Sequence, residues 1–159
     1  MGRFTLEELK EAFAEYDRLR IRCSETGDWS QYADAFTEDA HYIEHAYGDM
    51  HGREAIREWI VKVMAPFPHM EFPQDWVVFD EENGAVVFQA QNIWPHPTDR
   101  SHPGFGFPVF TRLVYAGDGL WSSEEDCYNP ARDAGRVLKE WRAAGGKFAT
   151  AEQVHMKPH

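Results

Sequence analysis

The sequence predicts one α+β domain with helices packed on one face of a curved, mostly antiparallel sheet. Its 159 residues fit the usual length of a single domain. Helical periodicity dominates residues 5–64, whereas residues 69–128 are mostly strand-like and include two tight hairpin signals. Helices gathered before a run of hairpins are typical of this fold class. We expect the domain to span residues 1–146, with residues 147–159 forming a peripheral tail.

The helical part begins with clear start and stop signals. Thr5 and Glu8 fit a capping box, apolar residues then recur every three or four positions, and Gly27 ends the helix. Asp28 begins a second, short helix. A third amphipathic helix covers residues 55–64 and stops before two prolines.

Strands account for most of the remaining chain. Residues 40–47 alternate and are rich in aromatic side chains, and residues 48–52 form a turn or a short returning strand. Four longer strands are expected at residues 69–80, 85–94, 107–115 and 120–128. Asn129 and Pro130 are the N-cap and first residue of a last helix that runs to about residue 144.

Composition argues against several classes of partner. Lys and Arg total 16 against 27 Asp and Glu, which gives a net charge of −11 at neutral pH. Binding phosphate needs clustered basic side chains, so neither nucleic acid nor an anionic membrane surface is expected. Two cysteines make no disulfide framework, and no apolar run approaches the roughly 20 residues that cross a bilayer. The sequence therefore predicts a cytoplasmic protein.

Three stretches carry a family resemblance: GDWSQYADAFTEDAHYIEH (27–45), GREAIREWI (52–60) and GDGLWSSEEDCYNP (117–130). Together they resemble the nuclear transport factor 2-like superfamily, which includes ketosteroid isomerase, scytalone dehydratase, limonene epoxide hydrolase and the SnoaL-like polyketide cyclases. The resemblance implies a cone-shaped, half-open barrel with an apolar pocket between the sheet and three N-terminal helices. It also implies acid–base chemistry without a cofactor on a hydrophobic small molecule such as a polyketide, steroid or terpenoid.

The same resemblance implies catalytic roles for particular residues. Glu44 stands where ketosteroid isomerase carries its proton-shuttling carboxylate, and an apolar pocket would raise its pKa toward useful values. His69 stands near the catalytic histidine of scytalone dehydratase, with Glu25 near that enzyme's acidic partner. Arg20 occupies the isomerase's oxyanion-tyrosine position, and Tyr16 lies one turn earlier on the same helix face.

The last strand offers a further catalytic acid, whose direction depends on strand register. If Glu124, Asp126 and Tyr128 face inward, two carboxyl groups enter the pocket; the opposite register turns the set that includes Trp121 inward. We expect Asp126 to face inward. A buried acid is costly, so it requires a partner such as Arg20 or a protonated state.

Aromatic side chains make up 14% of the chain and could line the pocket. The residues predicted to contact substrate are Arg20, Trp59, Trp94, Phe110 and Tyr128. Trp59 is the strongest of the aromatic candidates, because the resemblance places an aromatic residue that faces the cavity at its position. A plain packed core would explain these aromatic residues equally well.

Histidines cluster in the sequence but do not predict a metal site. His41 and His45 share a strand face, yet they lie roughly 13 Å apart at about 3.3 Å per residue. The ligands of one ion lie about 2 Å from it. We therefore expect neither a bound metal nor a cofactor.

The sequence is compatible with three functions. The first is an isomerase, dehydratase or cyclase, although Arg20 and Thr111 replace the oxyanion-hole pair of ketosteroid isomerase. The second is a non-catalytic protein that binds a small molecule or a partner. The third is an epoxide-opening hydrolase in which Asp126 holds the attacking water and Arg20 bridges two acids.

Two further features are expected from the sequence. Apolar strand residues predict a homodimer formed through the outer face of the sheet; they are Trp76, Val78, Val87 and Trp121. The segment 95–107 is rich in Pro, Gly and His and is predicted to be a flap over or beside the pocket mouth.

Overall fold

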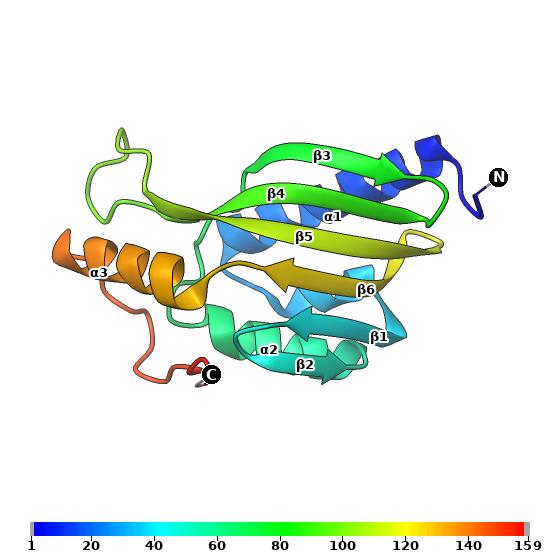
Figure 1. Cartoon of the computed structure of the whole chain (residues 1–159). Coiled ribbons are helices and arrows are strands. Elements are labelled where there is room, and N and C mark those ends of the chain that lie inside the picture. The colour runs from blue at the N-terminus through cyan, green and yellow to red at the C-terminus, as the bar shows by residue number, and fades with distance from the viewer. Residues whose placement is uncertain (1, 158–159) are drawn as a thin grey trace.

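The computed structural model describes residues 2–157 and contains one six-stranded sheet. The strands are β1 (Phe36–Glu44), β2 (Gly48–His51), β3 (Gln74–Asp80), β4 (Ala85–Trp94), β5 (Phe105–Gly117) and β6 (Leu120–Cys127). Their order is β2–β1–β6–β5–β4–β3, and every neighbouring pair is antiparallel except β1 with β6. The sheet is curved and is not closed into a barrel (Figure 1).

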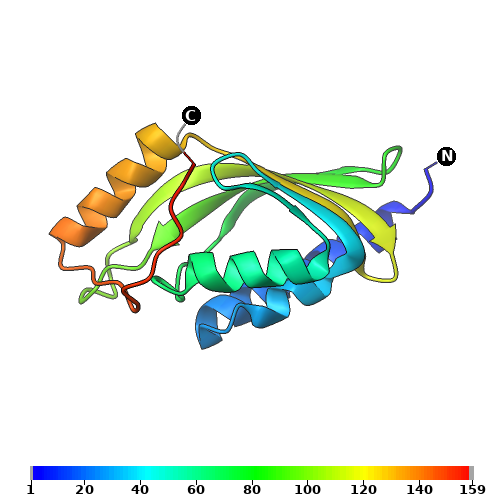
Figure 2. The same ribbon diagram turned by 90° about the horizontal axis from the view of Figure 1, so that it is seen from below.

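Helices cover the concave face of this sheet and flank one end of it. They are α1 (Leu6–Thr26), the 3-10 helix η1 (Ser30–Ala35), α2 (Arg53–Met64), the π-helical turn η2 (Pro130–Ala134) and α3 (Gly135–Ala143). Figure 2 shows α1 and α2 under the arch of the sheet and α3 beside one end. The predicted α+β fold, with three N-terminal helices over one face and a C-terminal helix, is confirmed. No helix within residues 2–157 is long and apolar enough to cross a membrane.

The first helix, α1, begins and ends as its sequence predicts. The Glu8 N–H donates to Thr5 Oγ1 at 3.2 Å, and the Thr5 N–H donates to Glu8 Oε2 at 2.8 Å, which completes the capping box. Gly27 follows with a φ of 74°, a conformation that glycine adopts without strain. Its N–H donates to the Cys23 carbonyl at 2.8 Å. These caps fix the length of the helix whose buried face carries Tyr16.

Three strands begin at different residues from those predicted, and β5 differs least, since it begins two residues earlier. β1 begins four residues earlier, because Phe36 already pairs with β6. β3 begins five residues later than predicted. The segment before it makes only an isolated bridge between Glu71 and Ile93, since Pro73 has no N–H to donate to a ladder.

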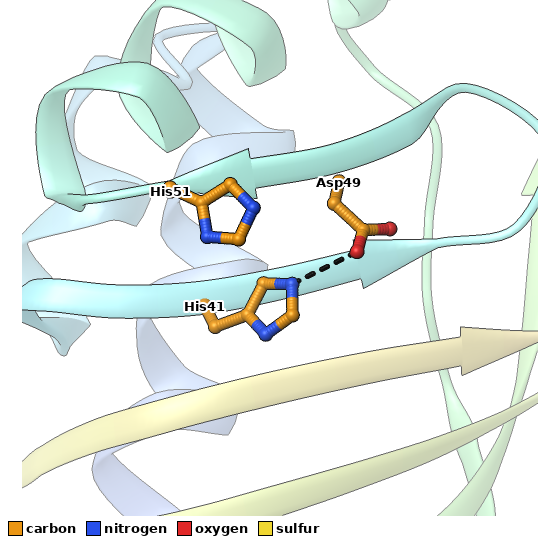
Figure 3. Close-up of side chains that lie close together, drawn as sticks. All are labelled: His41, Asp49 and His51. Carbon is orange, nitrogen blue, oxygen red and sulfur yellow. Dashed lines mark hydrogen bonds and ion pairs between the residues drawn. The ribbon is translucent and has the colours of Figure 1, made fainter.

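The strands β1 and β2 form a hairpin at one edge of the sheet, which confirms the short returning strand. His41 pairs with His51 across this hairpin, and Asp49 lies two residues from His51 (Figure 3). Tyr42 and Glu44 of β1 point to the concave side and line the cavity described below. Because side chains alternate along a strand, His41 faces the opposite, outer side.

A bulge in β6 resolves the choice of register that the sequence left open. Val114 of β5 pairs with Ser123, and the next residue, Tyr115, pairs with Trp121. Ser122 of β6 therefore has no pairing partner on β5. The extra residue turns Trp121 inward on the same face as Glu124 and Asp126. Both alternative sets therefore contribute inward side chains, and the prediction of an outer-face Trp121 is wrong.

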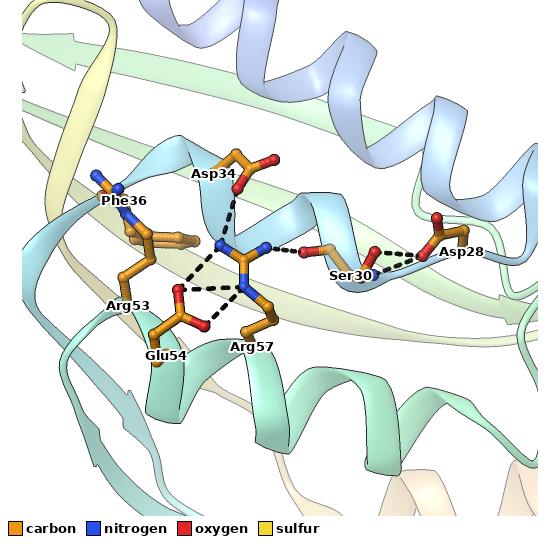
Figure 4. Close-up of polar contacts among 7 residues, drawn as sticks. All are labelled: Asp28, Ser30, Asp34, Phe36, Arg53, Glu54 and Arg57. Atoms are coloured by element: carbon orange, nitrogen blue, oxygen red, sulfur yellow. Dashed lines mark hydrogen bonds and ion pairs between the residues drawn. The ribbon is translucent and has the colours of Figure 1, made fainter.

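Two arginines of α2 join this helix to η1 and to the start of β1 (Figure 4). Arg57 donates to the Ser30 carbonyl and, at 2.9 Å, to Asp34 Oδ1. Arg53 Nε donates to the Phe36 carbonyl at 2.7 Å. These contacts tie α2 to the chain that leads into β1.

The C-terminal tail returns from α3 toward the β1–β2 turn (Figure 2). The Ala149 N–H donates to the Pro66 carbonyl at 2.7 Å, and the Lys157 N–H donates to the Ala46 carbonyl at 2.8 Å. The segment predicted to be peripheral is thus tied to the loop after α2 and to the β1–β2 turn. Its final two residues lie outside the described residues.

We expect Leu113→Ala to lower the free energy of unfolding by about 2–5 kcal/mol, because Leu113 is fully buried and its loss leaves a cavity. Urea unfolding measures this change. Val61→Ala is the control: Val61 is 42% exposed on α2, and its truncation is expected to change stability by no more than about 0.5 kcal/mol. Equal losses in the two variants would contradict the placement of the core.

Candidate active site

A cavity of about 310 Å³ lies between the concave face of the sheet and the helices. Its wall is mostly apolar and draws side chains from every helical element, from four strands and from the C-terminal tail. The large aromatic members include Trp29, Trp59, Phe67, Phe72, Trp94 and Phe107. Surroundings of this kind strengthen electrostatic interactions and disfavour charged groups.

The carboxyl group of Glu124 accepts hydrogen bonds from three tyrosines. The Tyr16 hydroxyl donates to Oε1 at 2.9 Å, the Tyr32 hydroxyl lies 2.8 and 2.9 Å from the two oxygens, and the Tyr42 hydroxyl lies 3.1 Å from Oε1. Burial, and next the charge of Asp126, raise the pKa of Glu124 to about 8, although the hydrogen bonds from Tyr32 and Tyr16 oppose this rise. Side chains from α1, η1 and β1 thus converge on one acid of β6.

Asp126 lies two residues further along β6 and also lines the cavity. The Thr111 hydroxyl donates to Oδ1 and the Tyr42 hydroxyl to Oδ2. Burial raises the pKa of Asp126, while these two hydrogen bonds and the charge of Arg20 oppose the rise. Tyr42 has one hydroxyl proton and two acceptors, so Glu124 and Asp126 share it as a donor.

Glu44 enters the same cavity from the end of β1 and pairs with Asp126 in the parallel β1–β6 register. Its Oε2 accepts the N–H groups of Ala46 at 2.9 Å and Tyr47 at 2.6 Å. Its Oε1 is buried and has no hydrogen-bond partner among residues 2–157. Burial, and next the charge of Asp126, raise the pKa of Glu44 to about 7, although the nearby Tyr128 hydroxyl and the N–H groups of Tyr47 and Ala46 oppose this rise. Glu44 therefore combines one anchored oxygen, one free oxygen and a pKa near neutrality.

Arg20 lines the cavity from α1 and is only 6% exposed. Its Nη2 donates to Asp17 Oδ1 at 2.7 Å, and its guanidinium lies over the rings of Tyr16 and Phe88. Its buried Nε has no partner within the described chain. The ion pair of Arg20 is with Asp17, so it is not the direct partner expected for Asp126; hydroxyl groups take that place.

Besides Arg20, three of the predicted binding residues line the cavity: Trp59, Trp94 and Tyr128. The indole N–H groups of Trp59 and Trp94 are buried and, within residues 2–157, without an acceptor. Buried polar atoms without partners are uncommon in folded proteins. Those that line a cavity are available to a bound molecule.

Phe110 does not line the cavity. Val109 and Thr111 face inward from β5, so Phe110 points to the outer face, where it is 47% exposed beside Trp76. Its predicted place in the pocket is wrong because the register of β5 turns it away.

His69 also lies outside the central cavity. Its Nδ1 is hydrogen-bonded to the Ser24 carbonyl at 2.8 Å, and it lines a second cavity with Glu25 and Arg20. The structure therefore brings together Glu44, Asp126 and Tyr16 from the predicted catalytic set and leaves His69 apart.

The segment that reaches over the cavity is the tail rather than the predicted flap. None of residues 95–104 lines the central cavity, and the Trp141 indole holds the base of this loop by donating to the Pro95 carbonyl at 3.1 Å. Phe148, Val154 and Met156 of the tail do line the cavity.

The sequence interpretation missed the three-tyrosine arrangement around Glu124. The sequence predicts Glu124 in one of two registers and does not connect it with tyrosines of other elements. The sequence signal for this arrangement was limited to the presence of several tyrosines in helices and strands that were expected to line the pocket. Their convergence requires the relative placement of α1, η1 and β1, which no local pattern encodes.

Candidate metal ligands lie elsewhere. Among the described residues, the groups of three close enough to hold one ion are His41, Asp49 and His51, and His45, Glu125 and Cys127. Neither group lines the central cavity.

Comparisons with known proteins agree with this fold. A family model for the SnoaL-like domain matches residues 18–124. A search of curated proteins finds no match. Among solved structures, an NTF2-like protein from Anabaena variabilis ATCC 29413 has a TM-score of 0.61 and 18% identity, covering 80% of this chain and 96% of that one.

Two other solved structures carry names that describe activities. A putative SnoaL-like polyketide cyclase from Jannaschia sp. CCS1 has a TM-score of 0.52 and 20% identity, covering 79% of this chain and 90% of that one. The epoxide hydrolase/cyclase-like enzyme SalBIII has a TM-score of 0.60 and 19% identity, covering 79% and 93%. At these identities the likenesses establish a shared fold.

The raised pKa values of Glu44 and Glu124 predict a pH-dependent stability. Each acid keeps its proton to a higher pH in the folded chain than its ordinary value of 4.5 allows when unfolded. Their stabilising contribution is therefore complete below about pH 4.5 and is lost as pH rises through about 7 to 8. Urea unfolding at pH 5, 6, 7 and 8 should show this fall, and Glu124→Gln should reduce it.

The exposed Glu38 provides a matched control for this measurement. Glu38→Gln should keep the wild-type dependence on pH. If Glu124→Gln and the wild type lose stability equally between pH 5 and 8, the proposed protonation of the buried acid is wrong.

Proposed function

The chain belongs to the SnoaL-like domain family, and from this premise we propose that it is a cofactor-independent acid–base enzyme of the cyclase or isomerase type. Its substrate in this proposal is a hydrophobic small molecule that carries carbonyl or hydroxyl oxygens. The observation that carries the proposal is Glu44, whose buried Oε1 is free and whose pKa lies near 7. A general base works best when its pKa is close to the working pH.

In this mechanism Glu44 removes a proton from a carbon next to a carbonyl group, or from a hydroxyl group whose oxygen then adds to a carbonyl carbon. In both routes the π electrons of the carbonyl group move onto its oxygen, and Glu44 later returns the proton to the product. The two N–H groups on its Oε2 hold the carboxylate in place while Oε1 accepts the proton. Negative charge then develops on the substrate oxygen. The Arg20 guanidinium, buried and with a free Nε, supplies a preorganised positive charge in the same cavity.

Asp126 and the tyrosines have a positioning role in the proposal. Burial raises the pKa of Tyr16, Tyr32 and Tyr42 well above that of free tyrosine, so all three remain hydrogen-bond donors. The charge of Asp126 helps to raise the pKa of Glu44 into the working range. The apolar wall supplies affinity for the hydrophobic part of the substrate.

The epoxide-opening alternative is less well supported. It requires an arginine or aspartate that bridges two acids. Here the hydroxyl of Tyr42 bridges Glu124 and Asp126, and Arg20 pairs with Asp17 instead.

Glu44→Gln is expected to lower turnover about 100- to 10,000-fold while ligand affinity stays within a few-fold, because the amide keeps the shape and removes the base. A panel of hydrophobic ketones and polyphenols, screened by thermal shift, supplies a ligand. Deuterium incorporation next to its carbonyl in D₂O, followed by NMR, then measures proton transfer.

Glu38→Gln controls for charge removal and should exchange at the wild-type rate. If the wild type binds the ligand tightly but exchanges deuterium no faster than buffer alone, the protein is better described as a non-catalytic binding protein. Exchange by Glu44→Gln within a few-fold of the wild type would remove Glu44 from the mechanism.

We also propose a homodimer through the outer face of the sheet. Trp76, Val78 and Phe110 are 42%, 56% and 47% exposed there, and the rings of Trp76 and Phe110 lie together. A group of exposed apolar side chains of this kind is typical of an interface. Trp121, predicted to join it, is in the core instead.

Light scattering should give a mass of twice 18.4 kDa at micromolar concentration. Val78→Glu should shift the protein toward the monomer, because it places a charge in the apolar patch. Val61→Glu, on the exposed side of α2, should leave the mass unchanged. A wild-type monomer would contradict the proposal.

A further inference from the structure

The outer side of the β1–β2 hairpin carries a cluster of ligand-type side chains that the proposed chemistry does not use. His41 comes from β1, and Asp49 and His51 come from β2 (Figure 3). All three are partly or fully exposed, on the face opposite to Tyr42 and Glu44. Their exposure leaves them accessible to a solute.

The hairpin register sets the two imidazoles directly opposite each other. The Gly52 N–H donates to the Ala40 carbonyl at 2.7 Å, so the adjacent pair His41–His51 is a non-hydrogen-bonded pair. In such pairs the side chains approach most closely. The two rings stack with centroids 4.4 Å apart and planes inclined by 18°.

Asp49 completes the group from the diagonal position. Its Oδ2 lies 3.0 Å from His41 Nε2. One ligand atom from each of the three side chains lies within 4.8 Å of the others. Ligands about 2.0–2.2 Å from one ion lie at most about 4.4 Å apart, so small rotations of these exposed side chains bring them into range.

We propose that His41, Asp49 and His51 bind one divalent transition-metal ion such as Zn²⁺. Two imidazoles and a carboxylate suit first-row divalent ions, and they leave positions for water or for a donor from another molecule. His41 and His45 lie too far apart along one strand to bind the same ion. The ligands meet across two strands.

The ion would tie β1 to β2 just before the turn that positions Glu44. That turn supplies the N–H groups of Ala46 and Tyr47 to the carboxylate of Glu44. Metal binding therefore stabilises the hairpin that supports the cavity, whether or not Glu44 is catalytic. The failure of one proposal leaves the other standing.

A second group on the outer face is the main competitor for the ion. His45 Nε2 lies 2.9 Å from Glu125 Oε1, and Cys127 lies close to both. We favour the first group because it offers two imidazoles that the backbone register holds opposite each other.

Isothermal titration of the untagged, EDTA-treated protein with ZnCl₂ tests the proposal. We expect one ion per chain, and at least a tenfold loss of affinity in both His41→Gln and His51→Gln. His45→Gln and Cys127→Ser should bind like the wild type. Zn²⁺ at about 100 times its wild-type Kd should raise the wild-type Tm by about 5–10 °C and that of His51→Gln by no more than about half as much.

Several outcomes would overturn the assignment. Loss of binding in Cys127→Ser with binding kept in His51→Gln would move the ion to the second group. No heat of binding up to millimolar Zn²⁺ would exclude a site of useful affinity. Circular dichroism must show that the variants are folded; if His51→Gln is not, Asp49→Asn replaces it, and wild-type affinity in Asp49→Asn would contradict the three-ligand site.

Discussion

The parallel pairing of β1 with β6 is the constraint on which the cavity depends. It sets Tyr42 opposite Glu124 and Glu44 opposite Asp126. Because successive side chains of a strand alternate between its faces, this register directs all four groups to the concave side together. A shift of one residue in β1 would turn Tyr42 and Glu44 outward and leave the two acids of β6 without their neighbours.

Three acids in one apolar cavity would be prohibitive without compensation, since an unpaired buried carboxylate costs several kcal/mol. Hydroxyl groups supply most of that compensation here. Glu124 accepts hydrogen bonds from three tyrosines of the chain itself, so its carboxyl group is satisfied without a ligand. Glu44, in contrast, keeps one carboxyl oxygen without a hydrogen-bond partner in the described chain. The satisfied acid organises the cavity wall, and the unsatisfied one faces the space where a ligand would bind.

The two faces of the sheet serve different purposes. The concave face, covered by helices, holds the buried acids and the apolar wall. The outer face carries exposed aromatic residues over β3 and β5 and histidines over β1 and β2. Since neighbouring positions on a strand belong to opposite faces, Thr111 reaches the cavity while Phe110, next to it, does not.

The sequence by itself determined the local elements of this protein and the inward position of Glu44. Capping residues, apolar periodicity and hairpin turn signals act over a few residues, so they can be recognised without a structure. Asp126 could also be identified as a candidate acid from the sequence. Two registers of its strand were possible, however, and no local pattern predicted the bulge in β6.

Only the tertiary structure decided which side chains meet. The bulge at Ser122 placed Trp121 and Glu124 on one face, and the packing of α1, η1 and β1 brought three tyrosines to Glu124. The hairpin register likewise placed His41 beside His51 rather than near His45. Contacts between strands and between layers depend on register and packing, which are set by the whole chain and by no single segment.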